Sequence, residues 1–380
     1  MKLHSYDEWS PLKEIIVGNA VNYTSHDREL SFDLFFHDNL KSRSEWYYPR
    51  VTSAPAGHQN RTRYSIKQRY VDELNEDVEG LAATLRQLGV TVHRPMTVDS
   101  TQGDIKTPGW SASVIPPLNV RDIALVVGDE VIETPPMLRS RYFETQFLKP
   151  IFADYFAQGG RWSVMPRPFM TDRSFDLSYT LETATGGPME PVQNPQPSPY
   201  DVGFEMMWDG AQCLRLGNDL IVNIANDNHR IACDWLERHL EGRFRIHRVW
   251  RLSDSHIDSK VLALAPGKLL VRSKEVMDFL PAAMQSWDII VAPEPRENNY
   301  PAYQDDDLVL TSLYIDLNVL SLSPDTVMVN EAYPELIRLL EQHKFQVVPV
   351  RHRHRRLFGG GFHCFTLDTV REGGPEDFLL

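Results

Sequence analysis

The feature that most constrains the fold is a pattern that recurs four times: two apolar runs joined by a tight turn, a helical stretch, and a further apolar run. The paired runs are DIALVVGDEVIETP from Asp122, CLRLGNDLIVNI from Cys213, KVLALAPGKLLVRS from Lys260 and YIDLNVLSLSPDTVMVN from Tyr314. Their turns contain Gly-Asp, Gly-Asn-Asp, Pro-Gly and Pro-Asp, which are hairpin or turn signals between strand-forming residues. The pattern therefore predicts four β-hairpins.

A helix and a third strand are predicted after each hairpin. The helices are expected at residues 142–156, 229–240, 274–284 and 332–343. In the third of them, Val276, Phe279, Leu280 and Met284 fall on one face. The closing strands are expected at RWSVMP, FRIHRV, DIIVAP and FQVVPV.

The two ends of the chain supply the parts of a fifth unit. These parts are the N-terminal strand EIIVG, a helix at 71–88, the strand TVHRP and the C-terminal strand GFHCFTL. Repeats of this length favour a radial arrangement, and closing a ring protects the edges of the sheets. The predicted fold class is therefore α/β, a closed ring of five modules, each with the order strand, strand, helix, strand.

The chain is expected to form a single domain over residues 1–380. Length alone suggests two or three domains, but a closed repeat architecture overrides that expectation. The intervals between the repeats are uneven, and long insertions near 40–65 and 183–203 account for the difference. Both stretches are rich in turn-forming residues, and TATGGPMEPVQNPQPSPYDVG is the clearer case.

Charge and hydropathy exclude two classes of partner. Lys and Arg number 39 against 52 Asp and Glu, a net charge of -13, so a polyanion such as a nucleic acid is not expected as partner. The opening MKLHSYDEWSPLKEIIVG lacks the apolar core of a signal peptide, and no apolar run reaches the roughly 20 residues that span a bilayer. A soluble, cytoplasmic protein is expected, without a membrane partner.

The three cysteines are predicted to be free thiols, because Cys213, Cys233 and Cys364 lack the paired spacing of a zinc or redox centre. Cys364 lies in GGGFHCFTL, where the glycines at 359–361 would let a substrate pass close to the backbone. A thiol with a pKa of about 8.5 needs a nearby cation or histidine to act as a nucleophile. Neighbouring side chains of a strand face opposite ways, so His363 is not expected to share the space of Cys364. The alternative is a buried structural cysteine after a flexible turn.

Polar residues recur where the repeats begin. Asp122 and Asp209 each precede a hairpin, and His256 and Asp258 stand two residues apart before a third. In a ring of repeats, equivalent positions face the central axis, so these residues and Cys364 can converge although they are far apart in sequence. Taken singly, the aspartates could be turn caps and His256 a surface histidine.

The motifs GGGFHC, HID, W-D-G-A-x-C-L-R-x-G, N-V-R-D and the opening EWSPLKEIIVG resemble those of the amidinotransferases. These are the enzymes related to glycine amidinotransferase and inosamine-phosphate amidinotransferase, and the likeness runs almost end to end. The resemblance implies the five-bladed α/β-propeller of the pentein superfamily, shared with arginine deiminases. It also implies that arginine donates its amidino group to an amine through a covalent cysteine intermediate, with no metal and no other cofactor.

The resemblance also assigns roles to individual residues. Cys364 matches the family nucleophile, His256 the general acid and base, and Asp209 the carboxylate paired with that histidine. Asp122 and Asp258 match the carboxylates that hold the guanidinium, in plane over the thiolate. His256 would protonate the departing ornithine amine and then deprotonate the acceptor.

The acceptor is expected to differ from glycine. Glycine-using members resemble Asn-Pro-Met before His-Ile-Asp, whereas this chain has Ser253-Asp254-Ser255, which enlarges the acceptor space. Glu275 falls where those enzymes place an arginine, near Arg272 and Lys274, and an acidic residue there would repel a carboxylate acceptor. In this respect the chain looks more like amidinotransferases of guanidine natural products, including the saxitoxin pathway. The full set expected to bind substrate is Asp122, Asp258, Ser253, Ser255, Glu275, Ser312 and Gly361.

Three other interpretations remain open at this stage. The same fold and triad with water as acceptor would make an arginine deiminase or a related guanidine hydrolase. A papain-like protease fits poorly, because its cysteine comes early in the chain and its histidine late. A non-catalytic ring-shaped binding module is the third. For the amidinotransferase, the partners are L-arginine and an amine acceptor, and a homodimer is possible.

Overall fold

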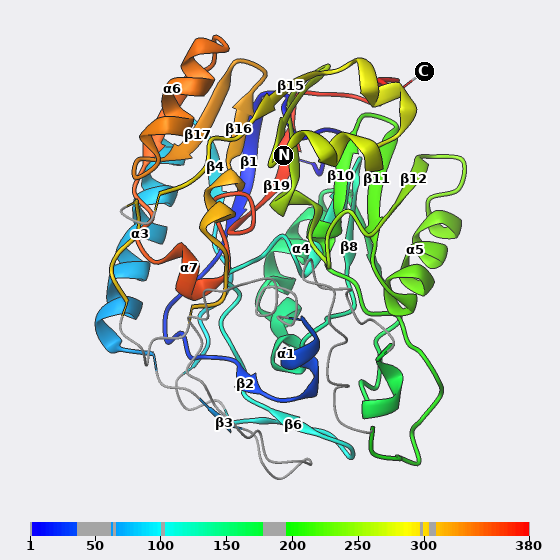
Figure 1. Ribbon diagram of the computed structural model, residues 1–380. Coiled ribbons are helices and arrows are strands. Elements are labelled where there is room, and N and C mark those ends of the chain that lie inside the picture. The colour runs from blue at the N-terminus through cyan, green and yellow to red at the C-terminus, as the bar shows by residue number, and fades with distance from the viewer. Residues whose placement is uncertain are drawn as a thin grey trace.

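The computed structural model describes residues 2–35, 62–63, 66–99, 103–177, 195–296, 299–303 and 309–379. Within these residues the main framework is five three-stranded sheets that share one design (Figure 1). In each sheet, one outer strand pairs antiparallel with the middle strand and the other pairs parallel with it. The sheets have the strand orders β19-β1-β4, β7-β8-β9, β10-β11-β12, β13-β14-β15 and β16-β17-β18.

The strands of these sheets are Leu12–Val17 (β1), Thr91–His93 (β4), Ala124–Val127 (β7), Glu130–Glu133 (β8), Arg161–Val164 (β9), Cys213–Leu216 (β10), Asp219–Ile224 (β11), Arg245–Trp250 (β12), Val261–Ala265 (β13), Lys268–Val271 (β14), Asp288–Val291 (β15), Leu320–Ser323 (β16), Thr326–Asn330 (β17), Gln346–Val350 (β18) and Thr366–Arg371 (β19). Two short ribbons pair Asp27–Arg28 (β2) with Thr62–Arg63 (β3), and Ile105–Lys106 (β5) with Ser111–Ala112 (β6). The α-helices are Leu30–Phe35 (α1), Gln68–Gln87 (α3), Lys149–Ala157 (α4), Asp227–His239 (α5), Pro334–Gln342 (α6) and Arg355–Phe358 (α7).

The four predicted hairpins and their closing strands are confirmed. The turns of the first two depend on glycine: Gly128 has φ +60° and Gly217 has φ +70°, values at which a residue with a Cβ is strained. The predicted sharing of one sheet by the two ends of the chain is also confirmed, because β1 lies between β19 and β4. The hairpins were predictable because their signals are local: each strand has its own apolar run, and each hairpin has its own turn residues.

The helix predicted at 274–284 is wrong. The segment forms two 3-10 turns, Lys274–Phe279 and Ala282–Ser286, with Pro281 between them. Proline has no N–H to donate and clashes with the preceding turn, so a continuous α-helix cannot pass through this position. Phe279, predicted on the buried face, is 46% exposed.

The helix predicted at 142–156 begins later than expected. A 3-10 turn, Glu144–Phe147, comes first, and α4 starts at Lys149. Pro150 sits in the first turn of α4, where its missing N–H costs nothing, and this fixes the start of the helix.

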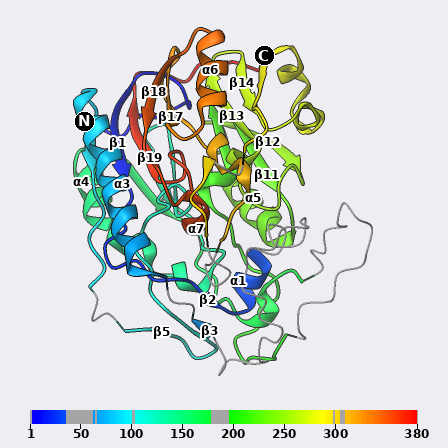
Figure 2. The same cartoon turned by 60° about the vertical axis from the view of Figure 1, so that its left-hand side comes forward.

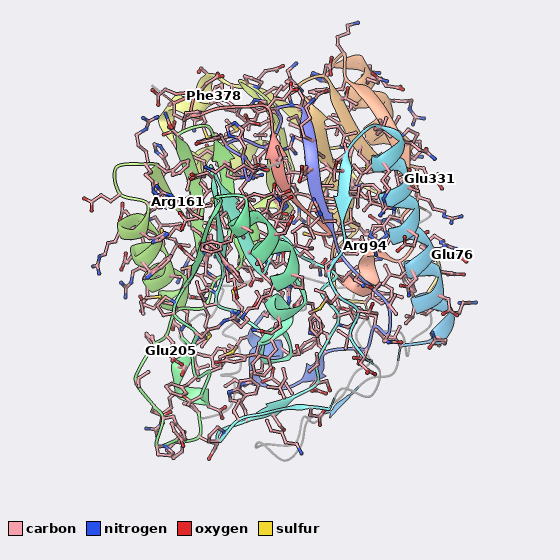
Figure 3. The ribbon with its side chains drawn as sticks, turned by 180° about the vertical axis from the view of Figure 1, so that it is seen from behind. Glu76, Arg94, Arg161, Glu205, Glu331 and Phe378 are labelled. Atoms are coloured by element: carbon pink, nitrogen blue, oxygen red, sulfur yellow. The ribbon has the colours of Figure 1, made fainter. Side chains whose placement is uncertain are left out.

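The helices α3, α4, α5 and α6 lie on the outside of the sheets (Figures 1 and 2). From behind, α4 lies in front of the strands and α3 at the edge of the molecule, where Glu76 of α3 is exposed (Figure 3). The inner face of α3 buries Val71, Leu74, Val78 and Leu81 in an apolar cluster with β1. None of the helices in the described part of the chain is long and apolar enough to cross a membrane.

The centre of the molecule contains a buried ionic network that joins the N-terminal segment to two sheets. Arg215 of β10 donates to Glu8 at 2.7 Å and to Asp368 of β19 at 2.7 Å. Arg121 and Arg371 also pair with Asp368, each at 2.6 Å. All five side chains are at most 5% exposed, so each charge depends on the others for compensation.

The insertion predicted near 40–65 lies outside the described residues except for 62–63, and that near 183–203 is described at 195–203 alone. Residues 195–203 contain neither helix nor strand.

Candidate active site

The cysteine singled out in the sequence lies in a turn, not in a strand. Residues 362–365 form a turn, and β19 begins at Thr366. Cys364 N–H donates to Asn318 Oδ1 at 2.8 Å. A Cβ at Gly360 would lie 2.3 Å from Asn119 Oδ1, and one at Gly361 would lie 2.7 Å from Asn318. These two glycines therefore pack the turn against its neighbours, which differs from the predicted role of admitting substrate.

Cys364 lines a cleft whose empty space, open solvent included, is about 850 Å³. Phe35 of α1 and Phe358 of α7 both line it, so the cleft lies between the two helices that Figure 1 shows below the strands. Asp122, His256 and Asp258 line the same cleft. The convergence predicted from the starts of the repeats is thus confirmed for these residues.

His256 is held by carboxylates from two other repeats. Its Nε2 lies 2.9 Å from Asp209 Oδ2, and its Nδ1 lies 3.8 Å from Asp122 Oδ1. Burial alone would lower the pKa of His256, but Asp122 and Asp209 outweigh it and raise this pKa to about 10. At neutral pH the side chain is an imidazolium that can donate a proton.

Asp122 and Asp258 each keep one buried oxygen without a hydrogen-bond partner among the described residues. Asp122 Oδ2 accepts from Arg141 at 2.7 Å, and Asp258 Oδ2 accepts from His363 Nδ1 at 2.7 Å. The Oδ1 atoms of both aspartates are buried and unsatisfied. A buried carboxylate oxygen without a donor is costly, so the cleft favours a ligand that brings N–H groups and positive charge.

The thiol is neutral before such a ligand arrives. Burial raises the pKa of Cys364 well above its usual value, and the negative charges of Asp258 and Asp122 raise it further. Asp258 Oδ2 lies 3.5 Å from Cys364 Sγ. A cation bound between the two aspartates would offset their charge and lower the pKa of the thiol.

The same residues also have metal-ligand spacing. One donor atom each of Asp122, His256 and Cys364 lies within 4.8 Å of the others. A metal ion would bind the neutral imidazole of His256 and the thiolate of Cys364, so its binding would release a proton from each. The buried oxygens of Asp122 and Asp258 that lack a donor match a ligand with N–H groups.

The prediction that His363 cannot share the space of Cys364 is wrong. Because the segment is a turn and not a strand, both side chains reach Asp258 Oδ2. The other ring nitrogen of His363, Nε2, lies 3.3 Å from Glu8 Oε2 in the central ionic network. His363 is thus a positioning residue that connects Asp258 to the core of the protein.

Replacing His363 with leucine should raise the KM for the amidino donor by roughly 10- to 100-fold, the loss expected for one hydrogen bond to a buried charge. His363→Asn, whose amide can replace the Nδ1 donor, should restore most of the affinity. Steady-state kinetics would measure KM and kcat separately, beside the thermal unfolding of each variant. Equal defects in the two variants at equal stability would contradict this role.

Most of the site residues predicted from sequence lie where expected. Asp122, Ser255, His256, Asp258, Ser312 and Cys364 line the cleft. Asp209 stands behind His256.

Ser253, Gly361 and Glu275 are not among the lining residues, and Glu275 requires a correction. Ser253 is buried and donates to Asp254. Glu275 is exposed at the start of a 3-10 turn, because the chain turns outward after β14. Arg272, one residue past that strand, lines the cleft instead, with its guanidinium 4.1 Å from the ring centre of Tyr314. The predicted repulsion of a carboxylate by Glu275 therefore does not apply.

Sequence reasoning missed Arg141, Asn318 and Phe35, and it named Arg272 only as a neighbour of Glu275. Asn318 stands two residues before β16, as Asp122 stands two before β7, so the rule of polar residues at repeat starts could have found it. Arg141 lies in an isolated 3-10 turn and carried no such signal; it joins Asp122 to Glu144.

The arrangement of the sheets is also found in a distantly related solved structure. The structure of DDAH from Pseudomonas aeruginosa matches with a TM-score of 0.53 at 14% identity, covering 94% of this chain and 99% of that one. At this identity the likeness concerns the fold alone. The protein has the fold of the penteins, with a cysteine, a histidine and paired carboxylates in one cleft.

The chain belongs to the amidinotransferases. The inosamine-phosphate amidinotransferase of Streptomyces griseus is 33% identical over 370 residues, 96% of each chain, and its solved structure superposes with a TM-score of 0.79 over 100% of this chain and 99% of that one. The L-arginine:L-lysine amidinotransferase of Pseudomonas savastanoi pv. phaseolicola is 30% identical over 381 residues, 99% of this chain and 96% of that protein. SxtG, an amidinotransferase of the saxitoxin biosynthetic pathway of Microseira wollei, matches with a TM-score of 0.76 at 29% identity, covering 99% of both chains. No protein-family model matches the sequence.

Proposed function

We propose that this amidinotransferase moves the amidino group of L-arginine to a primary amine larger than glycine, through a covalent amidino-cysteine at Cys364. The observation that carries the proposal is the pair of buried, unsatisfied oxygens of Asp122 and Asp258 beside the thiol. A planar guanidinium presents N–H groups on two edges and can satisfy both carboxylates at once. The similarity to the L-arginine:L-lysine amidinotransferase of Pseudomonas savastanoi supports arginine as the donor.

Binding of the donor prepares the nucleophile. The guanidinium offsets the charge of Asp122 and Asp258, so the thiol of Cys364 loses its proton to water. Arg272 and Lys260, which also line the cleft, supply positive charge for the α-carboxylate of arginine. The donor is then fixed at both ends, with its guanidinium carbon facing the sulfur.

In the first half-reaction, Cys364 Sγ forms a bond to the guanidinium carbon. His256 gives its proton to the arginine nitrogen that leaves, the bond from that nitrogen to the carbon breaks, and ornithine departs. The pKa of about 10 suits His256 to donate this proton at neutral pH. Asp209 stabilises the imidazolium and orients its ring.

In the second half-reaction, His256 is neutral and acts as a base. The acceptor amine attacks the amidino carbon, gives its proton to His256, and the bond from sulfur to carbon breaks to return the thiolate. The products are ornithine and a new guanidine. Water in place of the amine would give the guanidine hydrolase alternative, and the identity with amidinotransferases favours the transferase.

Incubation with arginine alone should convert the enzyme to a stable adduct, because ornithine leaves before the acceptor binds. Intact-mass analysis should show one added amidino group, and peptide mapping should place it on Cys364. Steady-state kinetics with both substrates should be ping-pong. Formation of citrulline, without ornithine and without a stable adduct, would indicate the hydrolase. Strictly sequential kinetics without an adduct would exclude the covalent mechanism.

The acceptor proposed here is an intermediate of guanidine natural-product biosynthesis, of the kind that includes toxins. The likeness to SxtG supports this. Ser255 stands beside His256 on the wall of the cleft, where a small side chain leaves room for a larger amine.

Three structural proposals accompany the function. The five like sheets would form a closed five-bladed propeller, and residues 1–380 a single domain in the cytoplasm. The oligomeric state is proposed to be a homodimer, which light scattering at several protein concentrations would test.

A further inference from the structure

A second cavity adjoins the cleft that contains Cys364, and its empty space, open solvent included, is about 470 Å³. Phe35, Asp254 and Ser255 line both cavities, so these three residues form the wall between them. The ring of Phe35 packs edge-on against His256, with 5.6 Å between the ring centres. The second cavity therefore begins next to the histidine that handles the acceptor's proton.

The two cavities differ in charge. Arg141, Arg272 and Lys260 line the first, whereas the described residues that line the second include no lysine or arginine. Its titratable groups are Asp176, Asp254 and His229, and burial lowers the pKa of His229 to about 3, so that ring is neutral. The second cavity is thus unsuited to a carboxylate and suited to an amine.

The walls of the second cavity are mainly apolar. The apolar part is formed by Leu34, Phe35, Met137, Phe175 and Met207, and the other described lining residues, which include Ser31, Asn226 and Asn228, are polar. Met137 and Met207 are 7% and 2% exposed, and methionine side chains adapt to irregular apolar ligands. Asp254 belongs to the wall shared with the first cavity. Its Oδ1 accepts hydrogen bonds from Ser253 Oγ and from the backbone N–H of Ser255. An occupant with an apolar body and a second amine matches this lining.

We propose that the second cavity binds the body of the acceptor, an elongated amine with an apolar chain and a second cationic group, while its reacting amine enters the first cavity. This assignment rests on the proposed function. Donor and acceptor then use different surfaces: the donor's α-carboxylate lies toward Arg272, and the acceptor's chain passes Ser255 into the second cavity. Apart from the shared wall of Phe35, Asp254 and Ser255, the residues that set specificity for the acceptor do not line the donor's cleft.

The test is an acceptor series with arginine as donor: linear diamines of increasing length, and for each length the amino acid with a carboxylate in place of the second amine. The value of kcat/KM should rise by roughly threefold for each added methylene that is buried, until the cavity is full. Each long diamine should exceed its carboxylate counterpart by about tenfold or more. A flat series, or equal use of the carboxylate compounds, would overturn the proposal.

Leu34→Trp should fill the second cavity and remove the dependence on chain length. Leu30→Trp is the matched control, since Leu30 lies on the same helix with similar partial burial and lines neither cavity, so the series should stay as in the wild type. A length dependence that survives in Leu34→Trp would contradict the proposal. If that variant does not fold, the wild-type series still decides.

Exchange of radiolabelled ornithine into arginine needs no acceptor and separates the two proposals. Absence of exchange in the wild type would mean that the proposed function fails. Exchange together with a flat acceptor series would leave that function standing and remove the assignment of the second cavity.

Discussion

Cys364→Ala should lose amidino transfer by a factor on the order of 10⁴ or more, because no other group can form the covalent intermediate. The protein should stay folded, since Cys364 contributes one small side chain to its apolar cluster. The measurement is kcat/KM with arginine and a diamine acceptor, beside a circular dichroism spectrum and a thermal unfolding curve.

Cys213→Ala is the matched control, because Cys213 is also a buried free thiol but lies in β10, in a different apolar cluster. Its cost should be a modest loss of stability with kcat/KM unchanged. Transfer that persists in Cys364→Ala at the wild-type rate would exclude the nucleophilic role. An equal loss in Cys213→Ala would point to general damage.

Arg215→Met should lower the free energy of unfolding by about 3–5 kcal/mol at pH 7, the range for removing one partner of a buried ion pair. Arg215 is 1% exposed and pairs with Glu8 and Asp368, which are buried and would lose this partner. Burial would raise the pKa values of both carboxyls, but Arg215 outweighs it and lowers them. Urea denaturation of the wild type and the variant would measure the loss.

The pH dependence of that loss follows from these lowered pKa values. A carboxyl whose pKa is lower in the folded state stabilises the fold above its unfolded pKa of about 4.3, and the contribution disappears as pH falls through the folded pKa. The difference between wild type and Arg215→Met should therefore narrow below about pH 4. Arg230→Met, which breaks exposed pairs with Asp227 and Asp234 on α5, should cost less than about 1 kcal/mol. If Arg215→Met and Arg230→Met lower the free energy of unfolding equally, burial of the ionic network does not determine its contribution to stability.

Local signals carried the prediction of the framework. A hairpin needs two apolar runs and a turn residue, all within about a dozen positions, and these features can be recognised in a single sequence. The helix predicted at 274–284 shows where local signals are insufficient. The apolar spacing of this stretch suggested a helix, but Pro281 interrupts the hydrogen bonding on which an α-helix depends.

The convergence of the candidate site residues was predictable for a related reason. Asp122, Asp209, His256 and Asp258 each stand two to five residues before the first strand of a repeat, and the starts of the repeats lie close together in space. Arg141 escaped notice, because a side chain of an isolated 3-10 turn has no periodic neighbour to indicate which way it points. Glu275 was assigned to the site from its alignment alone. It lies outside the site, because the chain turns outward after β14.

The sequence by itself indicated the strand units, because each depends on residue type and short-range order. The repeat pattern suggested that the two chain ends complete a fifth unit, and the resemblance to the amidinotransferases supplied the candidate thiol, histidine and carboxylates. The tertiary structure alone decided the charge states and the shape of the site. The pKa of His256 rises because Asp122 and Asp209 reach it from other repeats, and that of Cys364 because the fold buries it beside two aspartates. The wall of Phe35, Asp254 and Ser255 likewise joins α1 to a loop more than 200 positions away. Such contacts depend on distances in space, which burial and packing set and which spacing along the chain does not record.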